Sequence, residues 1–328
     1  MILVTGGTGF LGAELISRLL DEGKSVRAIK RKTSVIPEIL KSETSIDWRE
    51  ADILDHEALS DAMEGITRVY HCAAFVSFNK ADKKLMHKIN IEGTANLVNL
   101  CLRNKVDKLL HVSSVSAVGA SKQGRLISEE NPWLFDRTQS NYAISKYESE
   151  MEVFRGIAEG LNAVIVNPSI IIGKSAGDSG SGQLFKKVRD HLKYYPSGSC
   201  GIVDVRDVVS IMIRLMESDI SAERFILNGE NISYKRLFTL IADAYKLPAP
   251  NKKLSSWMLM SGYWLASLSK LVAGKDYGLT KEMVKSAEKE PAYSNQKITE
   301  ALNFSFREVE QSILEICQPT AAALTLKN

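Results

Sequence analysis

The chain has 328 residues, of which 45% are hydrophobic and 25% are charged. This composition is typical of a folded globular protein and excludes a disordered, collagen-like or linker-dominated chain. The 42 basic and 39 acidic residues leave a net charge of only +3, which does not indicate nucleic acid as a partner. At about 150 residues per domain, the length predicts two structural units or one large one.

The cysteine and histidine spacings argue against disulfide and metal sites. The four cysteines are Cys72, Cys101, Cys200 and Cys317. None forms a Cys-x-x-Cys pair, and a chain of this length buries a core without disulfide bonds, so we expect reduced thiols. The five histidines lack the spacing of metal ligands, and no metal site is expected. The first strand begins at Ile2 without a basic or cleavable segment before it, so we expect no signal peptide and a cytoplasmic protein.

The first half of the chain alternates short apolar runs with helical patterns. Strands are predicted at 2–4, 26–29, 46–51, 68–73, 108–113 and 162–167. Helices are predicted between them at 12–22, 58–63, 85–102 and 142–159. Strands separated by helices make right-handed crossovers and a parallel sheet. The predicted fold class is therefore α/β, a doubly wound parallel sheet covered by helices on both faces.

After Gly173 the sequence changes character. The segment 174–183 is rich in Gly and Ser, which predicts a flexible loop near a ligand. The remainder is mainly helical. Helices are predicted at 184–192, 208–217, 234–245, around Trp257, at 281–288 and at 307–317, and short strands at 202–203 and 225–226.

This change of pattern predicts two domains. The first spans 1–172, and the second, a mainly helical substrate lobe, spans 173–328, with part of 201–228 returning to the first. The apolar segment 254–273 contains five serines, a glycine and a lysine, which make it too polar for a good membrane span. We predict a buried or partner-facing helix there and no stable membrane insertion.

Glycines follow the first predicted strand at the point where the first helix begins. They allow a tight turn, close approach of the backbone to a pyrophosphate, and tight packing of helix on strand. The helix N-terminus adds unpaired N–H groups and the positive end of a dipole. We therefore predict an NAD(P)-binding Rossmann domain. The expected contacts in this loop are Gly6, Thr8, Gly9, Phe10, Leu11 and Gly12.

Basic residues end the second predicted strand, where an NAD-preferring protein usually places an acid for the ribose hydroxyls. They are Lys30, Arg31 and Lys32, and no Asp or Glu occurs between Lys24 and Pro37. A guanidinium clamps a 2′-phosphate through two hydrogen bonds. The pattern favours NADP over NAD, with contacts from Arg31 and Lys32, and NAD is the alternative cofactor.

Two further pairs of residues fit the cofactor. Asp52 accepts a hydrogen bond from the adenine amine in this interpretation, and the alkyl chain of Ile53 packs on the ring. Ala73 and Ala74 are small residues at the end of the fourth strand, where the backbone passes close to the cofactor.

A phenol and an ammonium lie four residues apart in the segment 142–146, and therefore on one face of a helix. The cation of Lys146 is predicted to lower the pKa of Tyr142, which makes the phenol a general acid/base near neutral pH. Ser114, at the end of the fifth strand, is placed to hydrogen-bond a substrate oxygen. These three residues are the candidate catalytic set, with Ser116 as the alternative to Ser114.

Together these motifs resemble those of the extended short-chain dehydrogenase/reductases, also described as the NAD-dependent epimerase/dehydratase family. The resemblance rests on the segments 5–12, 71–74, 90–94, 113–114, 142–146 and 167–168, and on Asp52. It implies that Tyr142 is the catalytic acid/base and that Lys146 lowers its pKa and holds the nicotinamide ribose. It also implies that Pro168 and Ile171 lie along the nicotinamide and that Asn90 braces the active-site helix. Relatives usually form homodimers through two long helices, here 85–102 and 142–159.

Within the family, the segments 26–31 and 203–209 resemble the dihydroflavonol reductase and hydroxysteroid dehydrogenase branch. Nucleotide-sugar epimerases usually carry an acid after the second strand. They also usually carry a stretch of charged and aromatic residues at the position of 198–202 in this chain. The different residues here count against a nucleotide-diphosphate site. The aromatic residues expected at the pocket would suit an apolar or ring-bearing small molecule. They are Phe75, Phe78, Trp133, Phe135, Tyr194 and Tyr195.

The resemblance thus implies an enzyme that reduces a ketone or aldehyde with NADPH, or oxidises the alcohol in reverse. The second hypothesis is a nucleotide-sugar epimerase or dehydratase that uses the same Tyr142 and a transient ketone. A third, a non-catalytic nucleotide-sensing regulator, is ranked last because such a protein should have lost Tyr142 or Lys146, and both are present.

Overall fold

The computed structural model describes residues 1–121, 125–135, 139–255 and 287–318. The apolar segment predicted at 254–273, from residue 256 onward, and most of the helix predicted at 281–288 lie outside these residues. Within the described part of the chain, no helix is long and apolar enough to cross a membrane.

Contacts divide the chain into two compact units. The first comprises Met1–Ser169, Val205–Leu227 and Ser294–Phe304, and the second comprises Ile170–Asp204, Asn228–Tyr293 and Ser305–Asn328. The return of Ser294–Phe304 to the first unit is a feature that the sequence pattern did not predict. Each unit has its own hydrophobic core.

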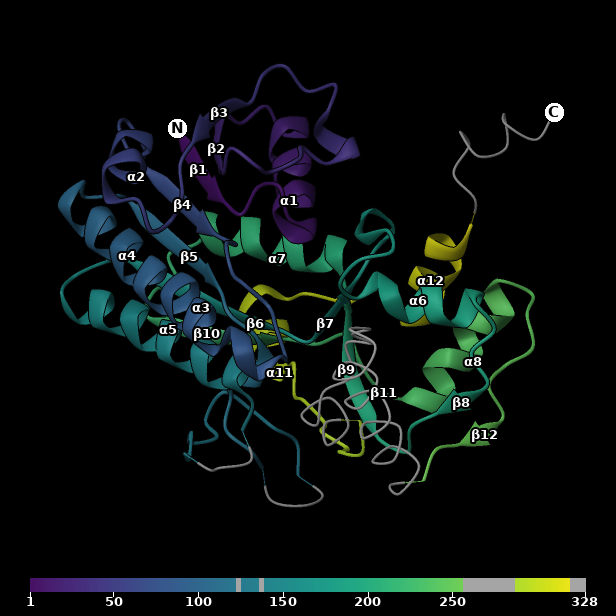
Figure 1. Ribbon diagram of the computed structural model, residues 1–328. Coiled ribbons are helices and arrows are strands. Elements are labelled where there is room, and N and C mark those ends of the chain that lie inside the picture. Colours follow the sequence, from purple (N-terminus) through teal and green to yellow (C-terminus); the bar gives the residue numbers. More distant parts are fainter. Residues whose placement is uncertain (122–124, 136–138, 256–286, 319–328) are drawn as a thin grey trace. The chain divides into compact units, whose positions relative to one another are not determined.

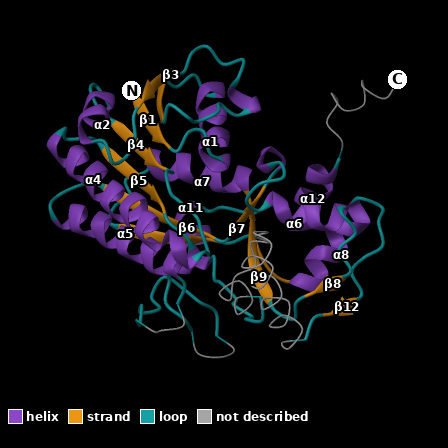
Figure 2. Cartoon of the chain, in the orientation of Figure 1, coloured by secondary structure: helices purple, strands orange, loops and turns teal. Residues whose placement is uncertain are grey.

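The first unit is built on a seven-stranded sheet in which every strand pairing is parallel (Figures 1 and 2). Its strands, in spatial order, are β10 (Glu223–Leu227), β6 (Ala163–Pro168), β5 (Lys108–Val112), β4 (Arg68–His71), β1 (Ile2–Thr5), β2 (Val26–Lys30) and β3 (Asp47–Glu50). The order reverses direction between β1 and β4, and ligands of such sheets bind beyond the carboxyl ends of the strands at this point. The predicted α/β class is confirmed.

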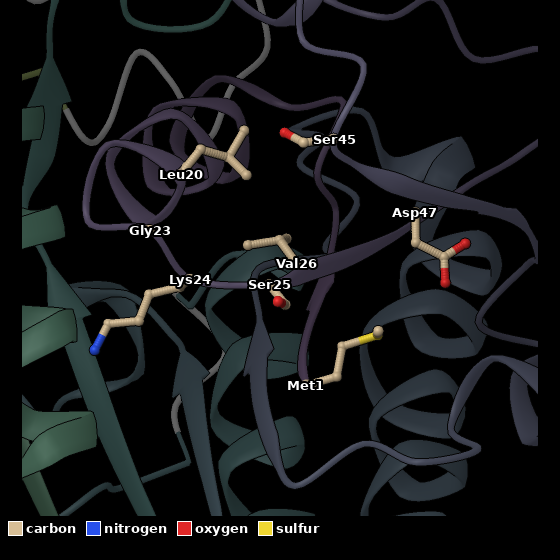
Figure 3. A pocket seen from close by; sticks show the side chains of 8 residues that line it. All are labelled: Met1, Leu20, Gly23, Lys24, Ser25, Val26, Ser45 and Asp47. Carbon is tan, nitrogen blue, oxygen red and sulfur yellow. The ribbon is translucent and has the colours of Figure 1, made fainter.

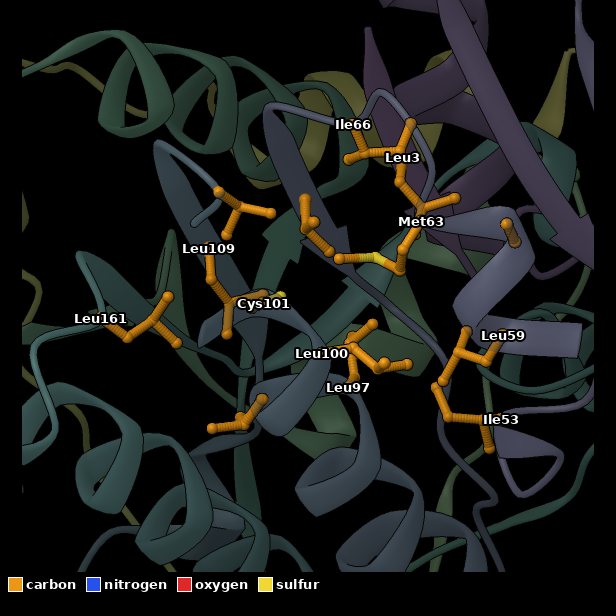
Figure 4. Packing of buried hydrophobic residues seen from close by; sticks show 14 of the residues in the cluster. Leu3, Ile53, Leu59, Met63, Ile66, Leu97, Leu100, Cys101, Leu109 and Leu161 are labelled. Carbon is orange, nitrogen blue, oxygen red and sulfur yellow. The ribbon is translucent and has the colours of Figure 1, made fainter. Parts of the chain in front are cut away.

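Helices cover both faces of this sheet, so its inner strands β1, β5 and β6 are fully buried, whereas the edge strand β3 is partly exposed. Its helices are α1 (Phe10–Asp21), α2 (His56–Ala62), α3 (Lys83–Met86), α4 (Gly93–Arg103), α5 (Asn141–Ala158), α7 (Val205–Glu217) and α11 (Gln296–Leu302). One face packs on α2, α4 and α5, where Leu3, Met63 and Leu100 meet (Figure 4). Burying each such side chain contributes about 1.5–3 kcal/mol to stability, so this layer fixes the helices that carry the site. α1 and α7 pack together elsewhere in the unit.

The helix predicted at 85–102 is interrupted. α3 is followed by a π-helical segment, His87–Glu92, and α4 begins only at Gly93. A Cβ on Gly93 would lie 2.7 Å from a side-chain methyl carbon of Ile53, so a glycine is needed for this close approach. π-helical turns often occur at functional sites, and this one contains the buried Asn90.

The second unit has small sheets and three described helices. Its strands are β7 (Ile170–Ile172), β8 (Tyr194–Tyr195), β9 (Ser199–Asp204), β11 (Glu230–Ser233) and β12 (Lys252–Lys253), in the orders β11-β9-β7 and β12-β8. Its described helices are α6 (Gly182–Arg189), α8 (Tyr234–Ala244) and α12 (Val309–Cys317). Buried Phe185, Ile202 and Leu237 contribute to their shared core. The three helices correspond to the patterns predicted at 184–192, 234–245 and 307–317.

Candidate active site

The glycine loop joins β1 to α1 in a tight turn that depends on three glycines. Gly6 has φ +70°, and a Cβ on it would lie 2.7 Å from the backbone nitrogen of Ala73. Gly9 caps α1 and has no side chain with which to satisfy the first N–H groups of the helix. A Cβ on Gly12 would lie 2.3 Å from the carbonyl oxygen of Gly6. The loop therefore packs closely against the backbone after β4 and presents N–H groups at a helix N-terminus, an arrangement that fits a dinucleotide phosphate.

The residues predicted to contact adenine differ in exposure. Asp52 is partly buried, and its Oδ1 accepts a hydrogen bond from the Leu54 N–H at 2.9 Å. Ile53 is buried in the core of the first unit beside Gly93. Asp52 is thus partly exposed, with one carboxylate oxygen bonded to the backbone, whereas the Ile53 side chain packs in the core.

The basic residues at the end of β2 are largely open to solvent. Arg31 and Lys32 are exposed, and Lys30 is partly buried. The parallel register pairs Lys30 with Glu50 of β3, an acid that the sequence reasoning did not consider. Register partners present their side chains on the same face of a sheet, so Glu50 reduces the local excess of positive charge. Arg31 remains the better candidate for a phosphate contact.

A chain of buried hydrogen bonds begins below the glycine loop. Thr94 Oγ1 donates to the Asn90 carbonyl at 2.5 Å and lies 2.9 Å from His71 Nε2. The hydroxyl of Thr94 must therefore accept from Nε2–H, which leaves Nδ1 of His71 to accept from Thr5 Oγ1 at 2.8 Å. Thr5 Oγ1 in turn accepts from the Ala73 N–H at 3.2 Å. Burial, with the charge of Lys146, lowers the pKa of His71 to about 3 and keeps it neutral.

The same chain continues to the helix that carries Tyr142. The side chain of Asn90 accepts from the Phe75 N–H at 2.7 Å and donates to Ser145 Oγ at 3.0 Å. Ser145 Oγ donates to the Tyr142 carbonyl at 2.9 Å. Asn90 therefore joins the loop after β4 to the first turn of α5, which is the geometry of the bracing role implied by the family resemblance.

The three candidate catalytic residues lie at the carboxyl end of β5 and the start of α5. Tyr142 follows the N-cap Ser140, whose Oγ accepts from the Ala143 N–H at 3.0 Å. Ser114 follows β5, and its side chain hydrogen-bonds Tyr142. Lys146 lies one turn further along α5, is only 3% exposed, and donates from Nζ to the Val112 carbonyl at 2.9 Å. The structure thus brings all three together.

The pKa of Tyr142 differs from the prediction. Burial raises it above the ordinary value, and the hydrogen bond with Ser114 opposes the rise only in part. Burial also lowers the pKa of Lys146 to about 8, although the negative charge of Glu150 opposes that shift. The expectation of a lowered tyrosine pKa was wrong for the chain alone, because burial outweighs the helix-face pairing on which it was based.

The predicted aromatic residues are dispersed in the first unit. The ring of Phe78 lies 5.9 Å from that of Tyr142, centroid to centroid. Trp133 instead stacks on Tyr147 at 4.5 Å, and Phe135 packs edge-on against Tyr147 while remaining 68% exposed. Phe78 is therefore the member of the set whose ring is in contact with that of Tyr142.

One surface pocket of the first unit lies elsewhere. It is lined by Met1, Leu20, Gly23, Lys24, Ser25, Val26, Ser45 and Asp47 (Figure 3). These residues lie where β1, β2 and β3 begin, whereas the glycine loop and Ser114 follow the carboxyl ends of their strands. The pocket therefore does not belong to the candidate active site.

Sequence reasoning missed a buried charged cluster behind the catalytic residues. Glu150 is completely buried on α5, Asn167 is completely buried at the end of β6, and Arg224 of β10 contacts Glu150 at 3.3 Å. The spacing of Tyr142, Lys146 and Glu150 at four-residue intervals places them along one side of the helix. That spacing was visible in the sequence, but the burial of the carboxylate was not.

Fold and site together define an NAD(P)-binding enzyme class in which a tyrosine, a lysine and a serine meet beside a Rossmann glycine loop. The chain belongs to the NAD dependent epimerase/dehydratase family, whose model matches residues 2–227. It is an extended short-chain dehydrogenase/reductase, and members of this group are NAD(P)-dependent reductases, epimerases and dehydratases.

Two curated relatives support this assignment. A dihydroflavonol 4-reductase homologue of Synechocystis sp. is 28% identical, over 95% of this chain and 92% of its own length. Sterol demethylase protein B of Methylococcus capsulatus is 30% identical, over 76% of this chain and 75% of its own length.

Solved structures share the same architecture. The crystal structure of gox2253 matches 96% of each chain with a TM-score of 0.82 at 29% identity. UDP-glucose 4-epimerase of Thermotoga maritima, solved with UDP-glucose, matches 96% of this chain and 97% of its own with a TM-score of 0.78. At 21% identity the latter likeness concerns the fold alone.

Proposed function

We propose that this enzyme reduces a ketone or aldehyde with NADPH and oxidises the corresponding alcohol in the reverse direction. The observation that carries the proposal is the hydrogen-bonded pair Tyr142 and Ser114 with buried Lys146 one helical turn away. The bound nicotinamide would supply the hydride. Tyr142 donates a proton to the substrate oxygen, Ser114 hydrogen-bonds that oxygen, and the Lys146 ammonium stabilises the phenolate that remains.

The raised pKa of Tyr142 supports the reductive direction. A phenol whose pKa lies above its ordinary value is protonated at neutral pH and therefore starts as the acid that reduction requires. The nearby positive charge of Lys146 favours the phenolate as the proton leaves, so the cation acts where negative charge develops.

Two lines of support favour an apolar substrate over a nucleotide sugar. The names of the two curated relatives refer to a dihydroflavonol and a sterol, both of which are ring systems. In the second unit, α6 buries Phe185 and Val188 in the core, and its cations lie on the opposite, exposed face. Of these cations, Arg189 and Lys186 both contact Asp178, at 2.8 and 3.6 Å, which makes them a poor diphosphate clamp.

A nucleotide-sugar epimerase or dehydratase is the second candidate function. The family name favours it, and the same tyrosine chemistry would serve a transient ketone. We expect that UDP- and GDP-sugars will not raise the melting temperature of the NADPH-bound protein. In contrast, at least one apolar ketone or aldehyde in a panel should cause NADPH oxidation, followed at 340 nm.

The two functions give opposite results in this experiment. Reduction consumes one NADPH for each product molecule, whereas epimerisation leaves the total cofactor oxidation state unchanged. Epimerisation begins with oxidation of the sugar, so this arm uses protein loaded with oxidised cofactor, NAD or NADP. A nucleotide sugar that stabilises this form by several degrees and is converted with no net change in cofactor oxidation state would replace the reductase assignment with the epimerase one.

The cofactor preference is tested at the end of β2. If Arg31 clamps the 2′-phosphate, Arg31→Ala should weaken NADPH binding by about 1.5–3 kcal/mol, the range for a hydrogen bond to a charged group, and leave NADH binding unchanged. Calorimetric titration with both cofactors measures this difference. Arg18→Ala is the matched control, because Arg18 is an exposed arginine paired with Glu22 on α1. Equal losses for both cofactors would contradict the phosphate contact.

A further inference from the structure

Glu150 is a buried carboxylate that the proposed reaction does not use. It lies on α5 four residues after Lys146, and none of its surface is exposed to solvent. A carboxylate loses much of its stabilisation when it leaves water, so its position requires compensating partners. The identity of those partners indicates what the charge does.

Hydrogen bonds hold the carboxylate of Glu150 from two strands. Asn167 of β6 donates from Nδ2 to Oε1 at 2.5 Å and also contacts the Ser114 carbonyl oxygen at 2.9 Å. Arg224 of β10 contacts Oε2 at 3.3 Å, and the same guanidinium donates to the backbone carbonyl of Glu129. Burial raises the pKa of the Glu150 carboxyl, and the contacts with Asn167 and Arg224 oppose that rise by favouring the charged form. Glu150 is thus fixed in place. Arg224 is not bound to Glu150 alone, because its guanidinium also donates to the uncharged carbonyl of Glu129.

Lys146 is a buried cation that needs a negative charge nearby. Its ammonium is buried, and its hydrogen bond to the Val112 carbonyl provides no negative charge. Glu150 is also buried and lies one helical turn further along the same side of α5, where a carboxylate favours the protonated form of Lys146. A buried cation needs such a charge nearby, because the desolvation that lowers its pKa is otherwise opposed only weakly.

We propose that Glu150 is a positioning residue of the active site, whose buried carboxylate supplies the counter-charge that keeps Lys146 protonated at neutral pH. The importance of that protonation for the reaction rests on the proposed function, because it is there that Lys146 stabilises the phenolate. The electrostatic link between the two residues can be measured without cofactor or substrate.

The titratable groups around Lys146 and Glu150 have pKa values well away from that of Lys146, so their titrations do not overlap with it. Around Lys146, burial lowers the pKa of His71 to about 3 and that of His111 well below its usual value, and raises that of Cys72 to about 12. Burial also raises the pKa of Tyr142 above its ordinary value. The groups facing Glu150 from the other elements are Arg224, Asn167, Ser113 and, through the Arg224 contact, Glu129. Within this set, a titration midpoint near pH 8 belongs to Lys146.

The experiment follows Lys146 directly by NMR of the full chain labelled with ¹³Cε-lysine, from pH 6 to 10. The resonance is assigned by its loss in Lys146→Met. The wild-type midpoint is expected near pH 8. Glu150→Gln keeps the size and polarity of the side chain but removes the charge, and should lower the midpoint by about one pH unit, the lower end of the shift produced by an opposite charge nearby.

Two further variants make the result specific to the charge of Glu150. Glu152→Gln is the matched control, because Glu152 lies on the same helix but pairs with Arg155 at 2.9 Å and is partly exposed, and it should leave the midpoint unchanged. Arg224→Gln removes the competing cation and should raise the midpoint. An unchanged midpoint in Glu150→Gln overturns the proposal.

If Glu150→Gln does not fold, Arg224→Gln decides alone, and anything other than a higher midpoint counts against Glu150. Failure of the proposed reductase activity would leave this titration unaffected, since no substrate enters it. The two proposals therefore fail independently.

Discussion

Replacing Tyr142 with Phe is expected to lower turnover by roughly 10²–10⁴-fold, the contribution that a well-placed general acid makes to catalysis. The variant keeps the aromatic ring that packs against Phe78 and removes only the hydroxyl, which carries the proton and the hydrogen bond with Ser114. Stability and NADPH affinity should change little. Steady-state rates with the ketone or aldehyde found by the NADPH assay, together with a fluorescence titration of NADPH, separate the two effects.

Tyr147→Phe is the control for this substitution. Tyr147 lies on the same helix five residues later, and its ring stacks on Trp133 rather than beside the catalytic set. Loss of this hydroxyl should leave turnover near the wild-type value. Retention of full turnover by Tyr142→Phe, with Tyr147→Phe behaving in the same way, would remove Tyr142 from the chemistry and with it the proposed mechanism.

The first unit and its glycine loop follow closely from the sequence. Local patterns carry the information here: apolar runs such as 2–4 predict buried strands, and Gly6, Gly9 and Gly12 follow such a strand and open a helix. A parallel sheet then brings the carboxyl ends of its strands to one edge by topology alone. The meeting of Ser114 with Tyr142 is a consequence of that topology.

The features that the sequence did not predict depend on distant contacts. The π-helical segment His87–Glu92 interrupts a continuous helical pattern, and the Gly93 to Ile53 approach beside it joins residues that are forty positions apart. The burial of Glu150 depends on Asn167 and Arg224, which come from two other strands. The spacing of residues along a helix shows which side chains share a face. It does not show which residues from other elements pack against that face.

The direction of the Tyr142 pKa illustrates the same limit. The four-residue spacing correctly places Lys146 on the same side of the helix, but the outcome depends on a balance between burial and charge. Desolvation is a property of everything around the phenol, including the turn after β5 that holds Ser114. Sequence spacing shows that a cation lies near the phenol, which lowers its pKa. Only the packed structure shows how deeply the phenol is buried, which raises its pKa.

Gly6→Ala is expected to lower the free energy of unfolding by about 2–5 kcal/mol and to abolish tight NADPH binding. Two costs add: a non-glycine residue at φ +70° is strained by about 1–2 kcal/mol, and the new Cβ would lie 2.7 Å from the Ala73 nitrogen, overpacking that typically costs about 1–3 kcal/mol. The three nearest atoms belong to the backbone of Cys72 and Ala73, so the segment after β4 and the glycine loop must separate. Urea unfolding and NADPH titration measure the two losses.

Gly23→Ala isolates the steric part of this effect. Gly23 also has φ +70°, but a Cβ there would meet nothing within 4 Å, so it should lose only the 1–2 kcal/mol of backbone strain and bind NADPH normally. The difference between the two variants measures the close approach of the loop to Ala73. If both lose the same stability, that approach contributes nothing, and the glycine at position 6 is required only for its backbone conformation.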